Sequence, residues 1–104
     1  MVKVEIIKNK DLINKVTISG HANYAKKGED LVCASVSSLA IGTLNALDEL
    51  SNNKLEIKIN EGLVSIEILE SEEIIQTILK VFEIQLKTIQ ESYKQYINIS
   101  ILEV

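Results

Sequence analysis

The chain has 104 residues, of which 46% are hydrophobic and 25% charged, a composition typical of one globular domain. It contains one Cys, one His and no Pro or Trp, which excludes an internal disulfide and a zinc site built from Cys and His pairs within one chain. The formal net charge of −4, from 11 basic and 15 acidic residues, argues against direct nucleic-acid binding, which needs a basic surface.

The first expected elements are two strands joined as a hairpin. Apolar Val2, Val4 and Ile6 alternate with polar residues, and alternation resumes at residues 16–18 after the polar stretch 8–11. Because the start of the chain alternates, it has no signal-peptide core, and no apolar run approaches the ~20 residues that span a membrane. We therefore expect a cytoplasmic protein with no membrane partner.

A loop is expected next, over residues 20–29. This stretch begins with Gly20, has Gly28 near its end and shows no sustained hydrophobic period. The two glycines are expected to serve the backbone geometry of the loop. Loops of about ten residues are longer than most connections and often carry function.

A helix is expected from Leu31 to about Ser51. Asp30 is a favoured N-cap residue, and its charge suits the positive end of the helix dipole. The residues that recur at helical spacing and form the expected buried stripe are Val32, Val36, Leu39, Thr43, Leu47 and Leu50.

The second half repeats the order of two strands and a helix. Alternating residues 55–60 and 64–68 flank a turn at residues 60–62, and residues 97–101 alternate again as a last strand. Ser71, followed by two acidic residues, is expected to cap the second helix. The expected core stripe of this helix is Ile75, Ile78, Phe82, Ile89, Tyr93 and Tyr96, widened by Ile74, Val81 and Ile84.

These elements predict one domain over residues 1–104 in the order ββαββαβ. Strands with one polar face and two long helices favour an α+β two-layer sandwich, with a mainly antiparallel sheet and both helices on one of its faces. The wide apolar arc of the second helix favours burial on two sides, against the sheet and against a second subunit.

The single His and the single Cys lie on either side of the long loop. His21 follows the second strand, and Cys33 is about the third residue of the first helix. The free N–H groups and positive partial charge of a helix N-terminus stabilise a thiolate, and an imidazole can take the thiol proton. The pair favours Cys-His nucleophilic catalysis, with the N–H groups near Cys33 and Ala34 expected to bind the oxyanion.

Simpler interpretations exist for each of these residues. A lone Cys in a helix is usually a small buried apolar residue, and a lone His in a loop is usually solvated. Ser37, one turn after Cys33, belongs either to the polar face of the helix or to the site. Tyr24 either stacks on a substrate or covers the sheet edge. Asp30 is foremost a cap, with the orientation of His21 as a second role that spacing alone cannot show.

The residues around the loop resemble the signature of a known family. The motif reads Gly-His-Ala at residues 20–22, Gly-Glu-Asp-Leu-Val-Cys-Ala at residues 28–34 and Val-Ser at residues 36–37. This combination, with the loop spacing between its parts, is similar to that of the ribosomal-processing cysteine protease family, Prp. The match covers about residues 20–47, and the order of elements fits the rest of the chain.

The resemblance implies a catalytic dyad in which Cys33 is the nucleophile and His21 the base, with Asp30 and Ser37 in supporting roles. It implies removal of the N-terminal extension of a bacterial large-subunit ribosomal protein, which is the expected partner. It also implies a homodimer, no metal and no cofactor, and a loop that substrate orders. The residues expected to support catalysis or bind substrate are Gly20, Tyr24, Gly28, Asp30, Ala34 and Ser37.

Two other functions remain open from the sequence. The first is a non-catalytic, ribosome-associated module that binds a protein or RNA without cleaving it. The second is an acyl-transfer or thiol-redox enzyme. The absence of a second Cys disfavours redox chemistry within one chain.

Overall fold

The computed structural model describes residues 1–26 and 28–104, so Lys27 of the expected loop lies outside the described residues. The order ββαββαβ and the α+β class are confirmed. The strands and helices are β1 (Val2–Asn9), β2 (Leu12–Ser19), α1 (Leu31–Leu50), β3 (Leu55–Asn60), β4 (Leu63–Ile68), α2 (Glu73–Ser92) and β5 (Ile97–Glu103).

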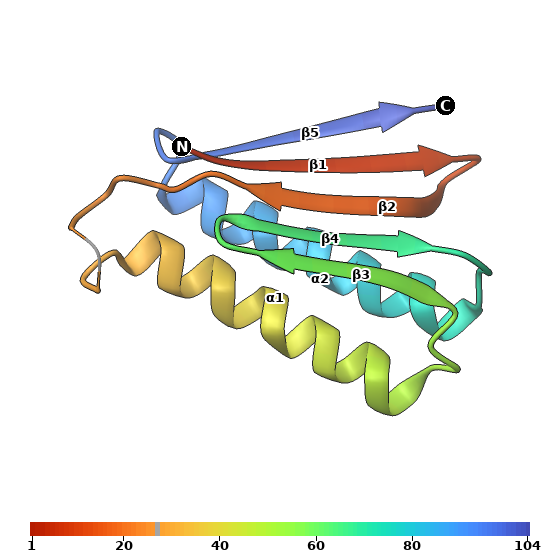
Figure 1. The fold of residues 1–104 in the computed structure, drawn as a ribbon. Helices are drawn as coiled ribbons and strands as arrows, with labels where there is room; N and C mark the ends of the chain where they lie inside the picture. Colours follow the sequence, from red (N-terminus) through yellow and green to blue (C-terminus); the bar gives the residue numbers. More distant parts are fainter. Residues whose placement is uncertain (27) are drawn as a thin grey trace.

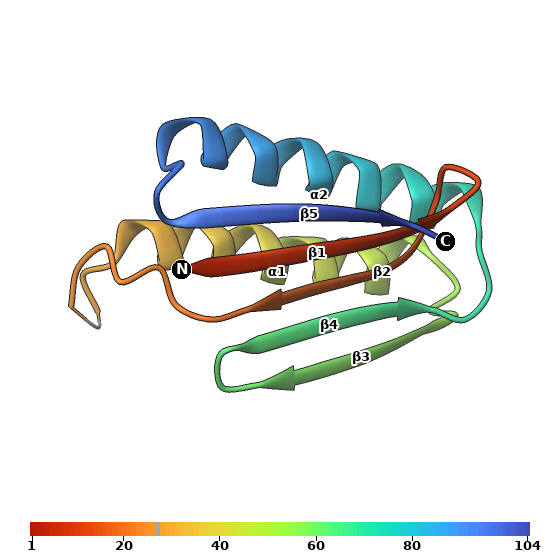
Figure 2. The ribbon, with the colours of Figure 1, turned by 90° about the horizontal axis from the view of Figure 1, so that it is seen from above.

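The five strands form one sheet in the order β3-β4-β2-β1-β5, with both helices on the same face (Figure 1). Every neighbouring pair is antiparallel except β1 and β5, which are parallel. The expected mainly antiparallel sheet is therefore confirmed, and the structure adds the strand order. Seen from above, the β3–β4 hairpin extends beyond the helices at one side of the sheet (Figure 2).

Each of the two hairpins has a tight turn between its strands. In the first, Lys10 and Asp11 both have positive φ, of 51° and 67°, which matches the twist of the flanking strands. In the second, Asn60 pairs with Leu63, which leaves Glu61 and Gly62 as the turn. This second turn lies beside the loop that joins β2 to α1, because the Gly20 N–H donates to the Gly62 carbonyl at 3.1 Å.

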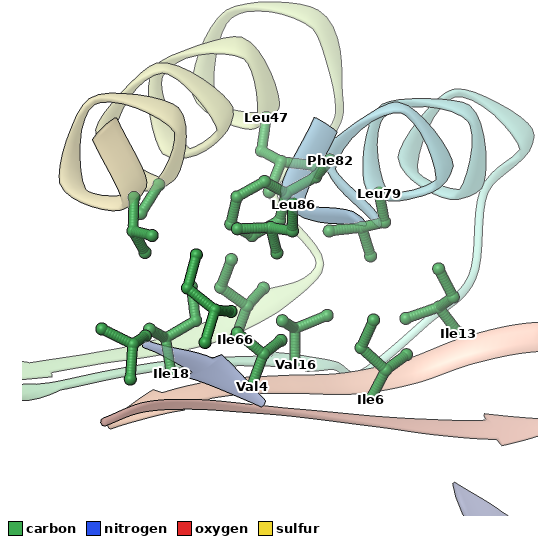
Figure 3. Packing of buried hydrophobic residues seen from close by; sticks show 14 of the residues in the cluster. Val4, Ile6, Ile13, Val16, Ile18, Leu47, Ile66, Leu79, Phe82 and Leu86 are labelled. Carbon is green, nitrogen blue, oxygen red and sulfur yellow. The ribbon is translucent and has the colours of Figure 1, made fainter. Parts of the chain in front are cut away.

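The core fills the space between the sheet and the two helices (Figure 3). The inward residues of β1, β2 and β4 meet the buried faces of α1 and α2, and Phe82 lies between the helices and the sheet. The largest side chains that are completely buried are Phe82, Ile6, Ile13, Leu47, Ile66, Ile75, Leu79, Leu86 and Ile97.

Some helix details differ from the expectation. Ser71 is not the cap of α2, because Glu72 occupies the N-cap position and the Ser71 hydroxyl accepts a hydrogen bond from Gln76. Leu50, expected in the stripe of α1, is 61% exposed because it lies on the last turn, beyond the sheet. Tyr93 and Tyr96 follow the end of α2 rather than continuing its stripe. Leu79 and Leu86 take the central buried positions instead.

One helix corrects the expectation about apolar runs. Among the described helices, α1 is long and apolar enough to cross a membrane by length and composition alone. Its residues Val32, Val36, Ala40 and Leu47 are buried within the fold. We therefore assign α1 as a core helix.

Candidate active site

The candidate site lies where the β2–α1 loop, the start of α1 and the β3–β4 turn come together. Cys33 is the third residue of α1, half-buried at the edge of the core. Its Sγ accepts a hydrogen bond from the backbone N–H of Ala22 at 3.3 Å. Ala22 itself is buried, so the loop enters the core immediately after His21. The sulfur is thus in direct contact with the backbone of the loop.

Asp30 joins the loop to the helix through both of its carboxylate oxygens. Oδ1 accepts the N–H of Cys33 and Oδ2 accepts the N–H of Tyr24, each at 3.0 Å. The hydrogen bond from Cys33 lowers the pKa of Asp30, and those from Tyr24 and Ala25 add to this against an opposing effect of desolvation. The expected N-cap is confirmed. Asp30 also fixes the loop relative to the nucleophile candidate.

The N–H groups that were expected to bind an oxyanion are already occupied. The Cys33 N–H donates to the Asp30 carboxylate, and the Ala34 N–H donates to the Asp30 carbonyl, both at 3.0 Å. Neither group is free in this structure, so the helix cap would have to open before either could hold an oxyanion. The N–H groups that the sequence suggested for catalysis are used here to cap the helix.

His21 is exposed, and its ring lies against the β3–β4 turn. A Cβ added to Gly62 would lie only 3.3 Å from His21 Nε2, so glycine leaves room for the imidazole. Gly62 also has a φ of +71°, which favours glycine on its own. Among the described residues, no hydrogen bond joins the His21 ring to Cys33 Sγ. The two side chains nevertheless line the same two cavities.

Two cavities meet at Cys33, and they differ in character. One, of about 300 Å³, is mainly apolar and runs between α1 and the β3–β4 hairpin. The other, of about 460 Å³, lies on the side of the loop and includes Asp30 and Glu61. His21, Cys33 and Ser37 line both. The apolar cavity is lined by Val36, Ala40, Ile41, Leu44, Ile59, Leu63 and Val64, among others.

The other predicted site residues divide into two groups. Gly28 and Ala34 line the larger cavity, and Gly20 lines the apolar one. Gly20 has a φ of +83°, and a Cβ there would lie 2.5 Å from the Met1 carbonyl oxygen, so it is needed for backbone geometry. Tyr24 lines neither cavity. Its ring packs edge-to-face on Tyr93 and Tyr96, with centroids 5.5 and 5.1 Å away.

Sequence reasoning missed the contribution of the second hairpin. Gly62 and Glu61 reach the site only because β4 pairs with β2, and nothing in the spacing of residues 20–37 indicates this pairing. The exposed apolar residues Ile57 and Ile59 of β3 offered one signal. They share the sheet face of buried Ile66 yet are 41% and 64% exposed, which marks an uncovered strip of that face.

The described residues hold no group of three or more His, Cys, Asp and Glu side chains placed to bind a metal ion. The groups that line the site are a thiol, an imidazole, a carboxylate, a hydroxyl and backbone N–H groups.

Comparisons with known proteins agree with the motif. A profile of the family described as "Cysteine protease Prp" matches residues 1–98. The ribosomal processing cysteine protease Prp of Mycoplasma pneumoniae is 38% identical over 87 residues, which cover 82% of this chain and 84% of that protein. The protein of the same name from Staphylococcus aureus is 30% identical, with 96% of this chain and 98% of that protein aligned.

Solved structures show the same fold. The Staphylococcus aureus Prp protease with a covalently linked product peptide superposes with a TM-score of 0.93 at 28% identity, covering 97% of this chain and 99% of that one. A second structure of the same protease, with a substrate peptide, superposes with a TM-score of 0.82 over the same shares of the two chains. The chain is thus similar to these proteins along nearly its whole length.

Proposed function

Because the chain belongs to the Prp family of cysteine proteases, we propose that it removes the N-terminal extension of a bacterial large-subunit ribosomal protein, with Cys33 as nucleophile and His21 as general base. Its relatives from Mycoplasma pneumoniae and Staphylococcus aureus are named ribosomal processing proteases, which supports the substrate class. The observation that carries the assignment of residues is the contact of Cys33 Sγ with the backbone of the loop that carries His21, at 3.3 Å from the Ala22 N–H.

The reaction follows from the groups at this point. The thiol proton passes to His21, and Sγ attacks the scissile carbonyl carbon, so that a C–S bond forms and the carbonyl π electrons move to oxygen. When the intermediate collapses, the C–N bond breaks and the protonated imidazole donates to the leaving amine. A water that gives its proton to His21 then hydrolyses the thioester. The Staphylococcus aureus relative was solved with a covalently linked product peptide, which supports a peptide as the substrate class.

The position of His21 supports its role as a base that moves with the substrate. It lines both cavities with Cys33, yet its ring is exposed and packs against Gly62. Catalytic hydrogen bonds are often absent from free enzymes and form only in the complex with substrate. A peptide that lies across Cys33 would displace the His21 ring from the β3–β4 turn. We therefore expect substrate to bring the imidazole to the sulfur.

The apolar cavity supports an apolar stretch of substrate beside the scissile bond. One wall comes from α1 and includes Ile41 and Leu44. The other comes from the uncovered face of the β3–β4 hairpin and includes Ile59. Ile41 and Ile59 are 60% and 64% exposed, so an apolar peptide side chain that packs on them would remove their surface from water. Such a substrate would bind along this groove and place its carbonyl at Cys33.

The surroundings of the protein are also part of the proposal. The exposed apolar residues Ile74, Val81 and Ile84 of α2, 38% to 53% exposed, favour a homodimer through this helix. The single reduced Cys is consistent with work in the cytoplasm. If the protein is a dimer, light scattering should give a mass of twice 11.6 kDa. The Val81→Lys variant should have the mass of a monomer.

The test is incubation with peptides that match the N-termini of large-subunit ribosomal proteins, followed by mass spectrometry. We expect one peptide to yield two fragments whose masses sum to that of the peptide plus one water. The Cys33→Ala variant should show no cleavage. Ser38→Ala, an exposed change on the same helix outside both cavities at Cys33, should cleave at the unmodified rate.

Two results would contradict the proposal. Cleavage that persists in the Cys33→Ala protein would remove the nucleophile assignment. Binding of a ribosomal-protein peptide with no cleavage by the unmodified protein would favour the non-catalytic module instead.

A further inference from the structure

The oxyanion of a cysteine protease needs a hydrogen-bond donor, and the N–H groups of Cys33 and of Ala34, the next residue, are occupied. The N–H groups of Cys33 and Ala34 both donate to Asp30, each at 3.0 Å. They hold the cap of α1 and cannot serve an oxyanion without breaking it. One N–H that is already directed at the sulfur comes from another part of the chain, the loop before α1.

This donor is the N–H of Ala22. It points at Cys33 Sγ from 3.3 Å, across the loop rather than along the helix. The Ala22 side chain is only 3% exposed, so the core holds this residue although its neighbour His21 is exposed. The donor is thus fixed while the proposed base beside it is free to turn.

We propose that the backbone N–H of Ala22 is a catalytic hydrogen-bond donor, which stabilises the Cys33 thiolate before attack and the oxyanion after it. This inference rests on the proposed function, because it takes Cys33 as the nucleophile. It gives two adjacent residues complementary tasks. The side chain of His21 moves the proton, and the main chain of Ala22 stabilises the negative charge that the proton leaves behind.

One donor can serve both states because the charge moves only a short way. When Sγ attacks, the new C–S bond takes up the sulfur electron pair and the carbonyl π pair moves to oxygen. The negative charge then lies two bonds from the sulfur. A donor that begins within hydrogen-bond distance of Sγ needs only a small shift to reach the oxygen. As the sulfur loses its charge it becomes a weaker hydrogen-bond acceptor. The Ala22 N–H then bonds more strongly to the oxygen that has gained the charge.

The loop is built to hold this N–H in place. Two residues before it, the Gly20 N–H donates to the Gly62 carbonyl at 3.1 Å. Two residues after it, the Tyr24 N–H donates to Asp30 Oδ2 at 3.0 Å. Both bonds join the loop to different elements, and Ala22 lies between them. A donor held before the reaction costs little reorganisation during it, which is where such groups gain most of their effect.

The experiment replaces the N–H without changing the side chain. Because Cys33 is the only cysteine, a synthetic thioester of residues 1–32 can be ligated to residues 33–104 with a native bond at that position. In the test protein, L-lactic acid replaces Ala22, which turns the amide into an ester and keeps the methyl group. In the control, L-malamic acid replaces Asn23, which places an ester one residue further on. The all-amide ligation product is the reference.

The simpler substitution Ala22→Pro also removes the N–H. It puts a ring in a buried position and fixes φ, so a loss of activity there would not separate catalysis from folding. The ester avoids this problem, and circular dichroism checks that all three ligated proteins have the same helix content.

We expect kcat/KM for the cleaved ribosomal-protein peptide to fall about 10²- to 10³-fold in the lactate-22 protein and to stay within about threefold of the reference in the Asn23 ester. The rate of iodoacetamide alkylation of Cys33 at neutral pH should fall in the lactate-22 protein alone, because the thiolate has lost a donor. This second readout does not depend on peptide cleavage.

A kcat/KM of the lactate-22 protein within about threefold of the reference would overturn the inference and leave the proposed function standing. An equal loss in both esters would also overturn it, because the effect would then belong to the loop as a whole. Cleavage that survives Cys33→Ala would overturn the proposed function, and the inference with it.

Discussion

The chain contains the unit ββα twice, and the two copies start their helices in different ways. In the first copy, residues 20–30 separate β2 from α1, and Asp30 ends that loop. Its carboxylate accepts one N–H from the helix, at Cys33, and one from the loop, at Tyr24. The start of α1 is therefore a place where polar groups converge on a thiol.

In the second copy, only residues 69–72 separate β4 from α2. The N-cap residue Glu72 makes no side-chain bond to its own helix, and its carboxylate accepts from the backbone and side chain of Asn52 instead. The first turn of α2 is fixed by Gln76, whose amide exchanges hydrogen bonds with the backbone of Ile13 at 2.8 and 2.9 Å.

The difference teaches where each half places its interactions. The first copy has an exposed imidazole, a half-buried thiol and a capped helix start within one loop. The second copy supplies the largest buried side chain, Phe82, and the buried carboxylate of Glu83. The start of α1 gathers the polar groups of the candidate site, whereas α2 carries buried side chains that stabilise the fold, and variants at these positions should separate the two effects.

The largest separation should come from His21. We expect His21→Ala to lower kcat/KM about 10²- to 10⁴-fold, because the general base is lost, while the free energy of unfolding changes by less than about 0.5 kcal/mol, because the side chain is exposed. Added imidazole should restore part of the rate in this variant, since a free base can enter the open cavity. Steady-state cleavage and urea unfolding measure the two effects.

The matched change on the helix is Glu49→Gln, which is exposed near the far end of α1. It should alter neither quantity. A loss of stability in His21→Ala equal to its loss of activity would contradict the separation of the two effects.

The converse separation should come from Glu83. Lys8 Nζ lies 2.9 Å from its Oε1 and Lys87 Nζ lies 2.8 Å from its Oε2, and its side chain is 3% exposed. Burial alone would raise the pKa of Glu83, but the hydrogen bonds from Lys87 and Lys8 outweigh it and leave the pKa lowered. We expect Glu83→Gln to cost about 3 kcal/mol of unfolding free energy, because Lys8, whose side chain is only 12% exposed, is left without its counter-charge. Urea unfolding at neutral pH measures this.

Two further measurements sharpen the Glu83 prediction. Since the folded pKa lies below the ordinary value of 4.5, the stabilisation is fully present above that value and is lost as pH falls through the folded pKa. Glu83→Gln should therefore flatten the fall of stability in acid. The double variant Lys8→Met with Glu83→Met should regain much of the lost stability, since it removes both charges together. Cleavage by the folded single variant should be unchanged.

The sequence predicted the elements well because each has a strong local pattern. Alternation located every strand, including β3, whose apolar face is largely uncovered. The strand order was not predictable. That β1 lies between β2 and a parallel β5 depends on contacts between the two ends of the chain. The cap of α2 was misplaced by one residue because Ser71 is the residue type that an N-cap favours, whereas Glu72 occupies the position and bonds Asn52 through its carboxylate.

The site was predictable only as a set of residues along the chain. The spacing of His21 and Cys33 around a loop indicated their chemistry, but not the Ala22 N–H that reaches the sulfur, because a backbone group carries no sequence signal. Gly62 was assigned to a turn and not to the site. Its contact with His21 arises from the pairing of β4 with β2, which no local pattern reports.

A smaller effect is expected from the caps themselves. Asp30→Ala should lower kcat/KM by up to about 10²-fold, because the loop and the thiol lose the side chain that holds them together. The folded pKa of Asp30 is lowered from its ordinary value of 3.8, so its stabilisation is present above that value and disappears as pH falls through the folded pKa. At neutral pH, Asp30→Ala should therefore melt at a lower temperature than the unmodified protein. In acid the two melting temperatures should converge.

Glu72→Ala is the matched change in the other copy. It removes bonds to Asn52 but no bond to the first turn of α2, so we expect unchanged cleavage and a smaller change in melting temperature. Equal losses of activity in the two cap variants would show that the caps act only through global stability.

The smallest effect should come from the contact that joins the two copies. Tyr24 lies in the loop of the first copy, and its ring packs edge-to-face on Tyr93 and Tyr96 at the end of the second, 5.5 and 5.1 Å away. Such aromatic pairs contribute about 0.5–1.5 kcal/mol each, so Tyr24→Ala should lower the unfolding free energy modestly. It should raise KM by a few-fold while kcat changes little, because the loop is held less well before substrate binds but in the same way afterwards. Tyr24→Phe keeps the ring and should match the unmodified protein in both. If Tyr24→Ala instead lowers kcat and leaves KM unchanged, the aromatic contact acts on the reacting groups themselves. The effects of the start of α1 and of the end of α2 would then not be separable at Tyr24.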